Sequence, residues 1–147
     1  MSRQARPVQP FELCVDSNLA HLATISQFVA DGARQAGLSE DEVFALQMAA
    51  DEACTNSIEH AYDGRQGEVR VCCWTEGDEY VVRVTDFGEP FDPESVPIPD
   101  TTVPLMERSI GGLGLYFMRE LVDRVDFVSD PVQGNQVIMR KRRRDPT

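Results

Sequence analysis

The chain has 147 residues, which is the size of one compact domain with its own hydrophobic core. Its formal net charge of −11 opposes direct nucleic-acid binding, because that binding depends on Lys and Arg side chains that neutralise phosphates. The sequence contains neither the roughly 18 consecutive apolar residues of a membrane span nor an apolar signal-peptide core near its start, so we expect a cytoplasmic protein without a membrane contact.

The first elements are predicted from residue 11 onward. Residues 1–10 contain two prolines and are expected to form a flexible lead-in. Phe11–Val15 alternates between apolar and polar residues, which predicts a strand. A helix should follow, with Asp16 or Ser17 as its N-cap and Gly37 at its end. The buried face of that helix is expected to consist of Leu19, Leu22, Ser26, Val29 and Ala33.

A long helix is predicted from Ser39 to Tyr62. Ser39 and Glu42 have the spacing of a capping box, which satisfies free N–H groups at a helix start, and Asp63-Gly64 supplies the stop. The helix carries a face of small and apolar residues that can press closely on a sheet. This face consists of Val43, Leu46, Ala50, Ala53, Cys54 and Ser57.

Polar residues form a narrow stripe on the second half of this helix. Glu52, Asn56, Glu59 and Asp63 recur at steps of three and four, which return to one side of a helix. The amide oxygen of Asn56 is a ligand type that Mg²⁺ prefers, and Glu52, one turn earlier, could accept a proton from an attacking hydroxyl. Taken alone, the stripe is better explained as a solvated helix face.

Two strands, at Glu68–Trp74 and Tyr80–Thr85, are predicted next, joined by a hairpin turn at residues 76–78. Asp86-Phe87-Gly88 ends the second strand. Residues 89–110 contain five prolines, which exclude a regular helix or a central strand. A loop of this length in a compact domain is typically a functional lid or disordered.

The last part of the chain is predicted to contain a helix and two strands. Glycines open the helix, which spans residues 111–122, and the strands are Val125–Val128 and Gln136–Met139 with a turn at 131–135. The basic run Arg140–Arg144 is interpreted as a solvated end, with contact to a polyanion or partner as the alternative.

The four cysteines, Cys14, Cys54, Cys72 and Cys73, lie in apolar segments and lack C-x-x-C spacing. This pattern favours reduced structural thiols over a zinc site. The adjacent Cys72 and Cys73 should point to opposite faces of their strand.

Three chemically suggestive features follow one another along the chain: Glu52-x-x-x-Asn56, Asp86-x-Gly88 and Gly112-Leu113-Gly114-Leu115. The last lies at a predicted helix N-terminus, whose free N–H groups and positive dipole end attract anions such as phosphate. A carboxylate at a strand end can accept from the exocyclic amine of adenine, and a glycine beside it leaves room for the flat base. Each feature alone is weak, because a tight helix start or an ordinary turn explains it as well.

With these motifs in this order, the sequence resembles the GHKL (Bergerat-fold) ATPases, and among them the small anti-sigma-factor serine/threonine kinases of the RsbW/SpoIIAB-like group. DEACTNSIEHAY at 51–62 matches the N box of that group, DFGEPFDP at 86–93 its G1 region, and ERSIGGLGL at 107–115 its G2 region. The resemblance runs from about Phe11 to Lys141. It implies an α/β two-layer sandwich, with a mixed, mostly antiparallel sheet and helices on one face.

The resemblance also implies roles for individual residues. Asn56 matches the Mg²⁺ ligand, and Glu52 matches the proposed general base on the hydroxyl of a protein substrate. Asp86 matches the adenine-reading aspartate, with Gly88 as its companion. The run Gly112, Leu113, Gly114 and Leu115 matches the backbone at the phosphates.

Some matching positions have a second interpretation. Arg108 matches an arginine that reaches the terminal phosphate, or is a solvated charge of the lid. His60 contacts phosphate, or packs at the helix end. Two positions depart from the family pattern: Pro90 stands where many relatives have a second glycine, and Asn135 replaces the threonine that helps to hold the adenine aspartate in classical members. Asn135 could make that bond instead.

The implied function is an ATP- and Mg²⁺-dependent serine/threonine protein kinase that phosphorylates a STAS-type anti-anti-sigma factor, sequesters a sigma factor, or does both. An ATP-binding partner-switching module without kinase activity is the alternative, and a scaffold that has lost nucleotide binding is a third. The expected domain spans residues 11–141, with an ATP lid at about 89–110 and a basic tail at 142–147. Relatives of this size often form homodimers, so a homodimer is possible.

Overall fold

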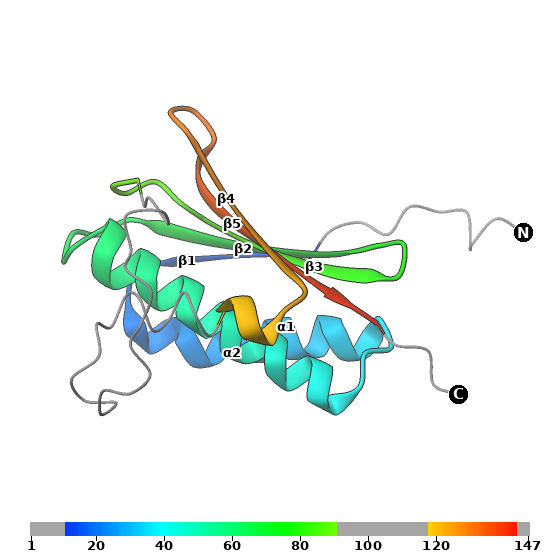
Figure 1. Cartoon of the computed structure of the whole chain (residues 1–147). Coiled ribbons are helices and arrows are strands. Elements are labelled where there is room, and N and C mark those ends of the chain that lie inside the picture. The colour runs from blue at the N-terminus through cyan, green and yellow to red at the C-terminus, as the bar shows by residue number, and fades with distance from the viewer. Residues whose placement is uncertain (1–10, 91–117, 144–147) are drawn as a thin grey trace, which may run out of the picture.

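The computed structural model describes residues 11–90 and 118–143, which form two layers (Figure 1). The expected lead-in at 1–10, residues 91–117 and the end of the basic tail at 144–147 lie outside the described residues. One layer is a five-stranded sheet with strand order β1-β2-β3-β5-β4, and all four pairings in it are antiparallel. Its strands are β1 (Phe11–Asp16), β2 (Glu68–Glu76), β3 (Glu79–Asp86), β4 (Arg124–Asp130) and β5 (Gly134–Arg142).

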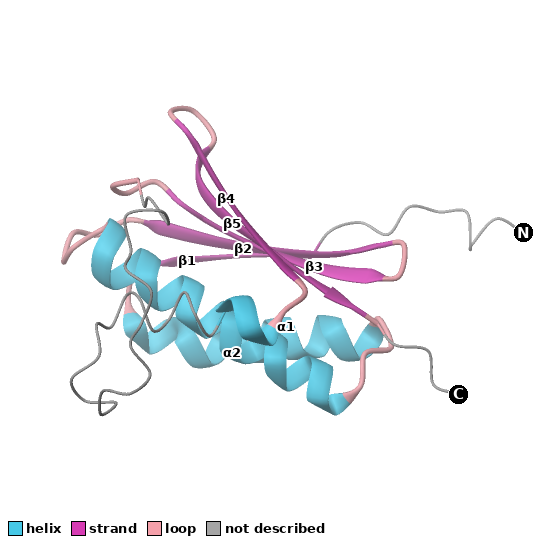
Figure 2. Cartoon of the chain, viewed as in Figure 1, coloured by secondary structure: helices cyan, strands magenta, loops and turns pink. Residues whose placement is uncertain are grey.

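The second layer contains the helices, which cover one face of the sheet (Figure 2). A short 3-10 helix, η1 (Leu19–His21), leads into α1 (Leu22–Gln35), and α2 (Glu40–Asn56) continues into a π-helical turn, η2 (Ser57–Ala61). Residues 118–121 add a helical segment within the predicted helix, and its Met118 is fully buried. The two-layer arrangement expected from the resemblance is therefore present.

The core lies between the helices and one face of the sheet. Val71 is opposite Val84, and Val82 is opposite Met139, so these side chains share one face and join the core. Because strand side chains alternate between faces, Cys73 belongs to the core while its neighbour Cys72 lies on the helix-free face. The predicted division of the two cysteines is confirmed.

The start of α1 differs from the prediction. The side-chain cap lies at the start of η1, which leads into α1: it is Asn18, whose side chain accepts from the Ala20 N–H at 2.9 Å, and not Asp16 or Ser17. Asp16 is the last residue of β1, and the Ser17 hydroxyl instead donates to the Arg65 carbonyl at 3.1 Å. Leu19 lies in η1 and is 46% exposed, so its predicted burial was wrong.

The start of α2 is as predicted. The Ser39 hydroxyl accepts from the Glu42 N–H at 3.2 Å, and the Glu42 carboxylate accepts from the Ser39 N–H at 2.7 Å, which completes the capping box. All six residues of the expected small, apolar face are buried.

The end of this helix contains a feature that the sequence pattern did not predict. The chain widens into the π turn of η2, where the Tyr62 N–H donates to the Ser57 carbonyl at 3.1 Å, five residues back. Asp63 and Gly64 then adopt positive φ angles of 50° and 81° and end the helix at the predicted stop.

The C-terminal strand is longer than predicted. It extends to Arg142, so the first residues of the basic run pair with β3 and are not a solvated end. Arg140 forms an ion pair with Glu76, and Arg142 lies 3.5 Å from Asp78.

Of the helices in residues 11–90 and 118–143, none is both long and apolar enough to cross a bilayer.

Replacing Ser39 with Ala should lower the free energy of unfolding by about 1 kcal/mol, because it removes one half of the capping box. Urea denaturation followed by circular dichroism would measure the change. Thr24→Ala is a matched control, because Thr24 is an exposed hydroxyl residue inside α1, and this change should leave stability equal or slightly higher. An equal loss in both variants would show that the cap contributes nothing specific.

Candidate functional site

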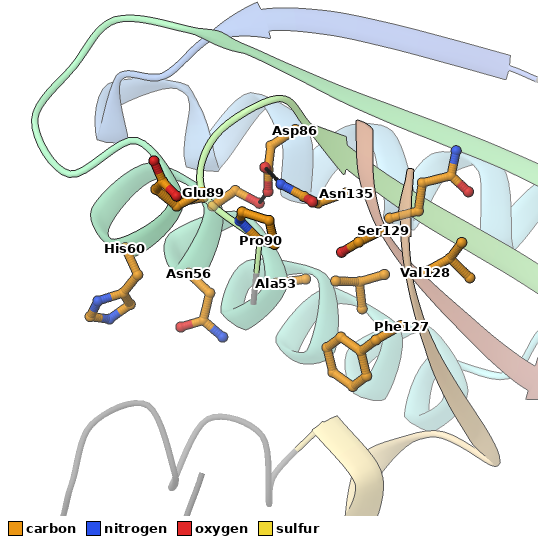
Figure 3. A pocket seen from close by; sticks show the side chains of 14 residues that line it. Ala53, Asn56, His60, Asp86, Glu89, Pro90, Phe127, Val128, Ser129 and Asn135 are labelled. Carbon is orange, nitrogen blue, oxygen red and sulfur yellow. Dashed lines mark hydrogen bonds between the residues drawn. The ribbon is translucent and has the colours of Figure 1, made fainter. Parts of the chain in front are cut away.

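A pocket opens between the end of α2 and the neighbouring ends of the strands (Figure 3). Its polar lining consists of Asn56, Ser57, His60, Asp86, Glu89, Ser129, Asn135 and Gln136. Its apolar lining consists of Ala53, Ala61, Pro90, Phe127, Val128 and Val137. The predicted residues Asn56, His60, Asp86 and Asn135 are thus brought to one cavity from segments far apart in the sequence.

Asp86 is the most constrained polar group of this pocket. It is the last residue of β3 and is only 6% exposed. One carboxylate oxygen accepts from the Ser57 hydroxyl at 2.6 Å, and the other accepts from the Gly88 N–H at 3.0 Å and the Asn135 amide at 2.8 Å. These three donors offset the cost of burying the carboxylate and still leave acceptor positions on its two oxygens for a ligand.

Asn135 also fixes the loop that follows β3. The same amide nitrogen that donates to Asp86 donates to the Gly88 carbonyl at 2.9 Å. The bond between Asn135 and Asp86 that the sequence suggested in place of a threonine is therefore present, and it comes with a second bond to the loop.

Gly88 packs directly against the π turn. A Cβ atom at this position would lie 2.4 Å from the Ala61 carbonyl oxygen, a distance that real contacts do not show. The next residue, Glu89, donates its N–H to the same carbonyl at 2.8 Å. The structure therefore requires glycine here so that the loop can close one side of the pocket.

Asn56 and His60 occupy the helical wall. Both line the pocket and project from the same side of the helix, away from the bonds at Asp86 (Figure 3). Asn56 is partly exposed and His60 is exposed, so both side chains are accessible to a bound molecule. Within the described ranges, no group of three or more His, Cys, Asp or Glu residues could hold a metal ion.

Glu52 lies one helical turn before Asn56, outside the lining of the pocket. Burial raises the pKa of its carboxyl, and the nearby carboxylates of Asp51 and Glu59 raise it further. Burial also raises the pKa of Asp51, one of whose oxygens is shielded from solvent without a hydrogen-bond partner among the described residues. Asp51 and Glu52 are therefore adjacent carboxyls whose raised pKa values make them ionise less readily than usual.

The remaining predicted site residues cannot be placed. Arg108, Gly112, Leu113, Gly114 and Leu115 lie outside the described residues, as does most of the expected lid.

Helical spacing predicted Ser57 only as part of the buried helix face, whereas in the structure its hydroxyl donates to Asp86. Tyr62 was also missed: its hydroxyl accepts from the Phe87 N–H at 2.8 Å and holds the loop after β3. Helical spacing gave no signal for either contact, because both depend on where β3 ends.

The cysteines are poor candidates for a nucleophile. Burial raises the pKa of Cys73 to about 12 and raises that of Cys54 as well. Since the thiolate is the reactive form, these two thiols act as core residues.

Comparison with known proteins identifies the family of this chain. Residues 15–141 match the family model described as the histidine kinase-like ATPase domain. The serine-protein kinase RsbW of Bacillus cereus (strain AH187) is 28% identical over 137 residues, which cover 90% of this chain and 84% of that protein. The serine-protein kinase RsbW of Halalkalibacterium halodurans is 29% identical over 126 residues, covering 83% of this chain and 77% of that protein.

A crystal structure of the RsbU and RsbW domains of Rv1364c from Mycobacterium tuberculosis has the same fold, with a TM-score of 0.68 and 18% sequence identity. The alignment covers 96% of this chain but 34% of the crystallised one, so this chain corresponds to about a third of the crystallised chain. Because the family model covers most of the sequence, from β1 to β5, the chain belongs to the histidine kinase-like ATPase domain family.

Proposed function

We propose that this chain is an ATP-dependent serine/threonine protein kinase of the anti-sigma-factor type. Its substrate would be a hydroxyl of a STAS-type anti-anti-sigma factor, and its other partner would be a sigma factor. The observation that carries the proposal is the buried Asp86 carboxylate, held by three donors at the inner end of a pocket. The names of the RsbW relatives support the kinase class.

The pocket fits a purine that carries an amino group. The free acceptor positions of Asp86 would receive the exocyclic amine of adenine. Where adenine has its exocyclic amine, guanine has a carbonyl oxygen. That oxygen and the Asp86 carboxylate are both acceptors, so they would repel each other. Asp86 therefore favours adenine over guanine, and Phe127 and Val137 offer apolar surface to the base.

Asn56 is the candidate protein ligand for Mg²⁺. Its amide oxygen lies on the accessible wall of the pocket, and Mg²⁺ commonly takes only one or two protein ligands while phosphates and waters supply the rest. When bound, the ion would neutralise phosphate charge. We assign Gly112, Gly114 and the backbone of Leu113 and Leu115 to the phosphates, with Arg108 near the terminal phosphate and His60 beside it.

Glu52 is the candidate general base. A carboxylate with a raised pKa holds a proton more tightly than an ordinary Glu, and so accepts one from a hydroxyl more readily near neutral pH. Burial and the two neighbouring acids provide that increase. In this role Glu52 takes the proton of the Ser or Thr hydroxyl as its oxygen attacks the γ-phosphorus and ADP leaves.

Asp86→Asn removes the charged acceptor and should weaken binding of a non-hydrolysable ATP analogue by about tenfold or more. This is the usual loss of affinity when a hydrogen bond to a charged group is removed. Isothermal titration calorimetry of Asp86→Asn against wild type, with ATP and GTP analogues, measures this. Asp31→Asn is the matched control, because Asp31 is exposed on α1. Unchanged affinity in Asp86→Asn would remove Asp86 from the site.

Asn56→Ala should abolish the dependence of this binding on Mg²⁺ while leaving a weaker, Mg²⁺-independent affinity. Titrations with and without the ion test the change. A variant that still binds more tightly with Mg²⁺, by the same factor as wild type, would show that the ligand lies elsewhere.

Glu52→Gln should slow phosphoryl transfer to a STAS-type protein by about 10²–10⁴-fold and leave nucleotide affinity unchanged. Transfer of labelled phosphate measures the rate. Nucleotide-dependent binding of the partner without labelling, in the wild-type protein, would instead identify a partner-switching module.

The pH dependence of transfer gives a separate test of Glu52. Because its pKa is raised, the rate should fall as the pH decreases through a value above the ordinary Glu pKa of about 4.3. Asp51→Asn and Glu59→Gln remove neighbouring negative charge, lower that pKa, and should move the acid limb of the profile to lower pH. A limb that stays in place in both variants would exclude Glu52 as the titrating group.

A further inference from the structure

The helix-free face of the sheet carries a second hollow, of about 320 Å³. Arginines from two adjacent strands line it, Arg70 of β2 and Arg83 of β3, together with Thr85 and Gln136. Arg83 stands between the core residues Val82 and Val84, so strand alternation directs it away from the helices. The hollow thus lies on the side of the sheet opposite the core; the helices cover the other side (Figure 1).

Aromatic rings hold both guanidinium groups in place. The Arg83 guanidinium carbon lies 5.2 Å from the centre of the Trp74 ring, and that of Arg70 lies 5.1 Å from the centre of the Phe87 ring. Arg70 is opposite Thr85 and Arg83 is opposite Cys72, so the two arginines are diagonal neighbours on one face. This stacking fixes two cations beside the hollow before any ligand arrives.

The charge of Arg83 is not matched within the described ranges. Arg70 forms an ion pair with Glu68, and on the same face Arg124 and Arg140 pair with Asp126 and Glu76. Arg83 has no carboxylate at ion-pair distance in residues 11–90 and 118–143, and its Nε is shielded from solvent without an acceptor. Shielding a donor without an acceptor costs free energy, which a bound anion would offset.

We propose that this hollow binds a Glu or Asp side chain from an acidic segment of a partner protein. A singly charged carboxylate suits the site better than a dianionic phosphate, because Glu12 lines the same hollow and the chain has a net charge of −11. Phe87 is 42% exposed and Val132 is 83% exposed at the rim, which provides apolar contacts for residues next to the carboxylate.

A second copy of the chain is a poorer occupant. In a symmetric pair, residues next to the two-fold axis meet their own copies, so a pair centred on this hollow would bring the arginines of one copy against those of the other. The proposed contact does not depend on nucleotide binding, because the hollow and the nucleotide pocket are on different sides of the sheet and share Gln136 at their boundary.

The test uses the full chain and a fluorescein-labelled heptapeptide in which Glu alternates with Leu. The control is the same peptide with every Glu replaced by Gln. Fluorescence anisotropy should give saturable binding of the Glu peptide and at least about tenfold weaker binding of the Gln peptide, equivalent to one charge-assisted contact. The emission of Trp74, the one tryptophan of the chain, should change with the same midpoint in the wild-type protein.

Arg83→Gln should weaken binding of the Glu peptide by about tenfold or more, and Arg83→Lys by an intermediate factor, because Lys keeps the charge but loses the planar stack. Arg124→Gln is the matched control, because Arg124 is on the same face but already paired with Asp126. The affinity of this variant for the Glu peptide should stay within about twofold of wild type. If the wild-type protein binds the ATP analogue, unchanged affinity of these variants for it would show that the variants are folded. It would also show that this site is separate from the nucleotide pocket.

Three results would each overturn the proposal. The first is equal affinity of wild type and Arg83→Gln for the Glu peptide, or no saturable binding in wild type. The second is displacement of the peptide by inorganic phosphate at matching concentration, which would identify a phosphate site. The third is a wild-type dimer in sedimentation that Arg83→Gln dissociates, which would assign the hollow to a second copy.

Discussion

The buried carboxylate of Asp86 is the interaction on which the site depends. Its three donors come from different parts of the fold: Ser57 in the π turn, Gly88 in the loop after β3, and Asn135 in β5. A carboxylate this buried is stable only where such donors are in place. The same bonds that hold the end of α2 against the sheet therefore also fix the acceptor that a nucleotide base would meet.

The π turn makes this junction possible. A π turn adds one residue to a helical turn and changes the direction of the side chains and carbonyls that follow it. In this chain the Ala61 carbonyl is free to accept from Glu89 and to lie against Gly88. The pocket at Asp86 is thus closed on one side by backbone contacts between the helical layer and the loop after β3. Such contacts hold the position of Asp86 without filling the cavity with side chains.

Much of the fold follows from local patterns. The capping box at Ser39 and Glu42, the stop at Gly64 and the hairpin between β2 and β3 each depend on residues a few positions apart, and all are present. The apolar face of α2 was predictable for the same reason, because 3.6-residue periodicity directly reports which side is buried. Asn56 and Asp86 could be proposed as site residues because their chemical types occur in a characteristic order along the chain.

The sequence by itself thus determined the elements, the core face and the family, whereas tertiary structure decided the contacts between distant segments. Asn18 became the helix cap because Asp16 ends β1 and Ser17 bonds to a loop 48 residues away. β5 runs to Arg142 because its backbone pairs with β3 as far as Glu79, and acidic side chains of the neighbouring hairpin lie beside its basic ones. The bond between Ser57 and Asp86 joins residues 29 positions apart. Local periodicity carries no information about such contacts, because they form only where packing brings separate segments together.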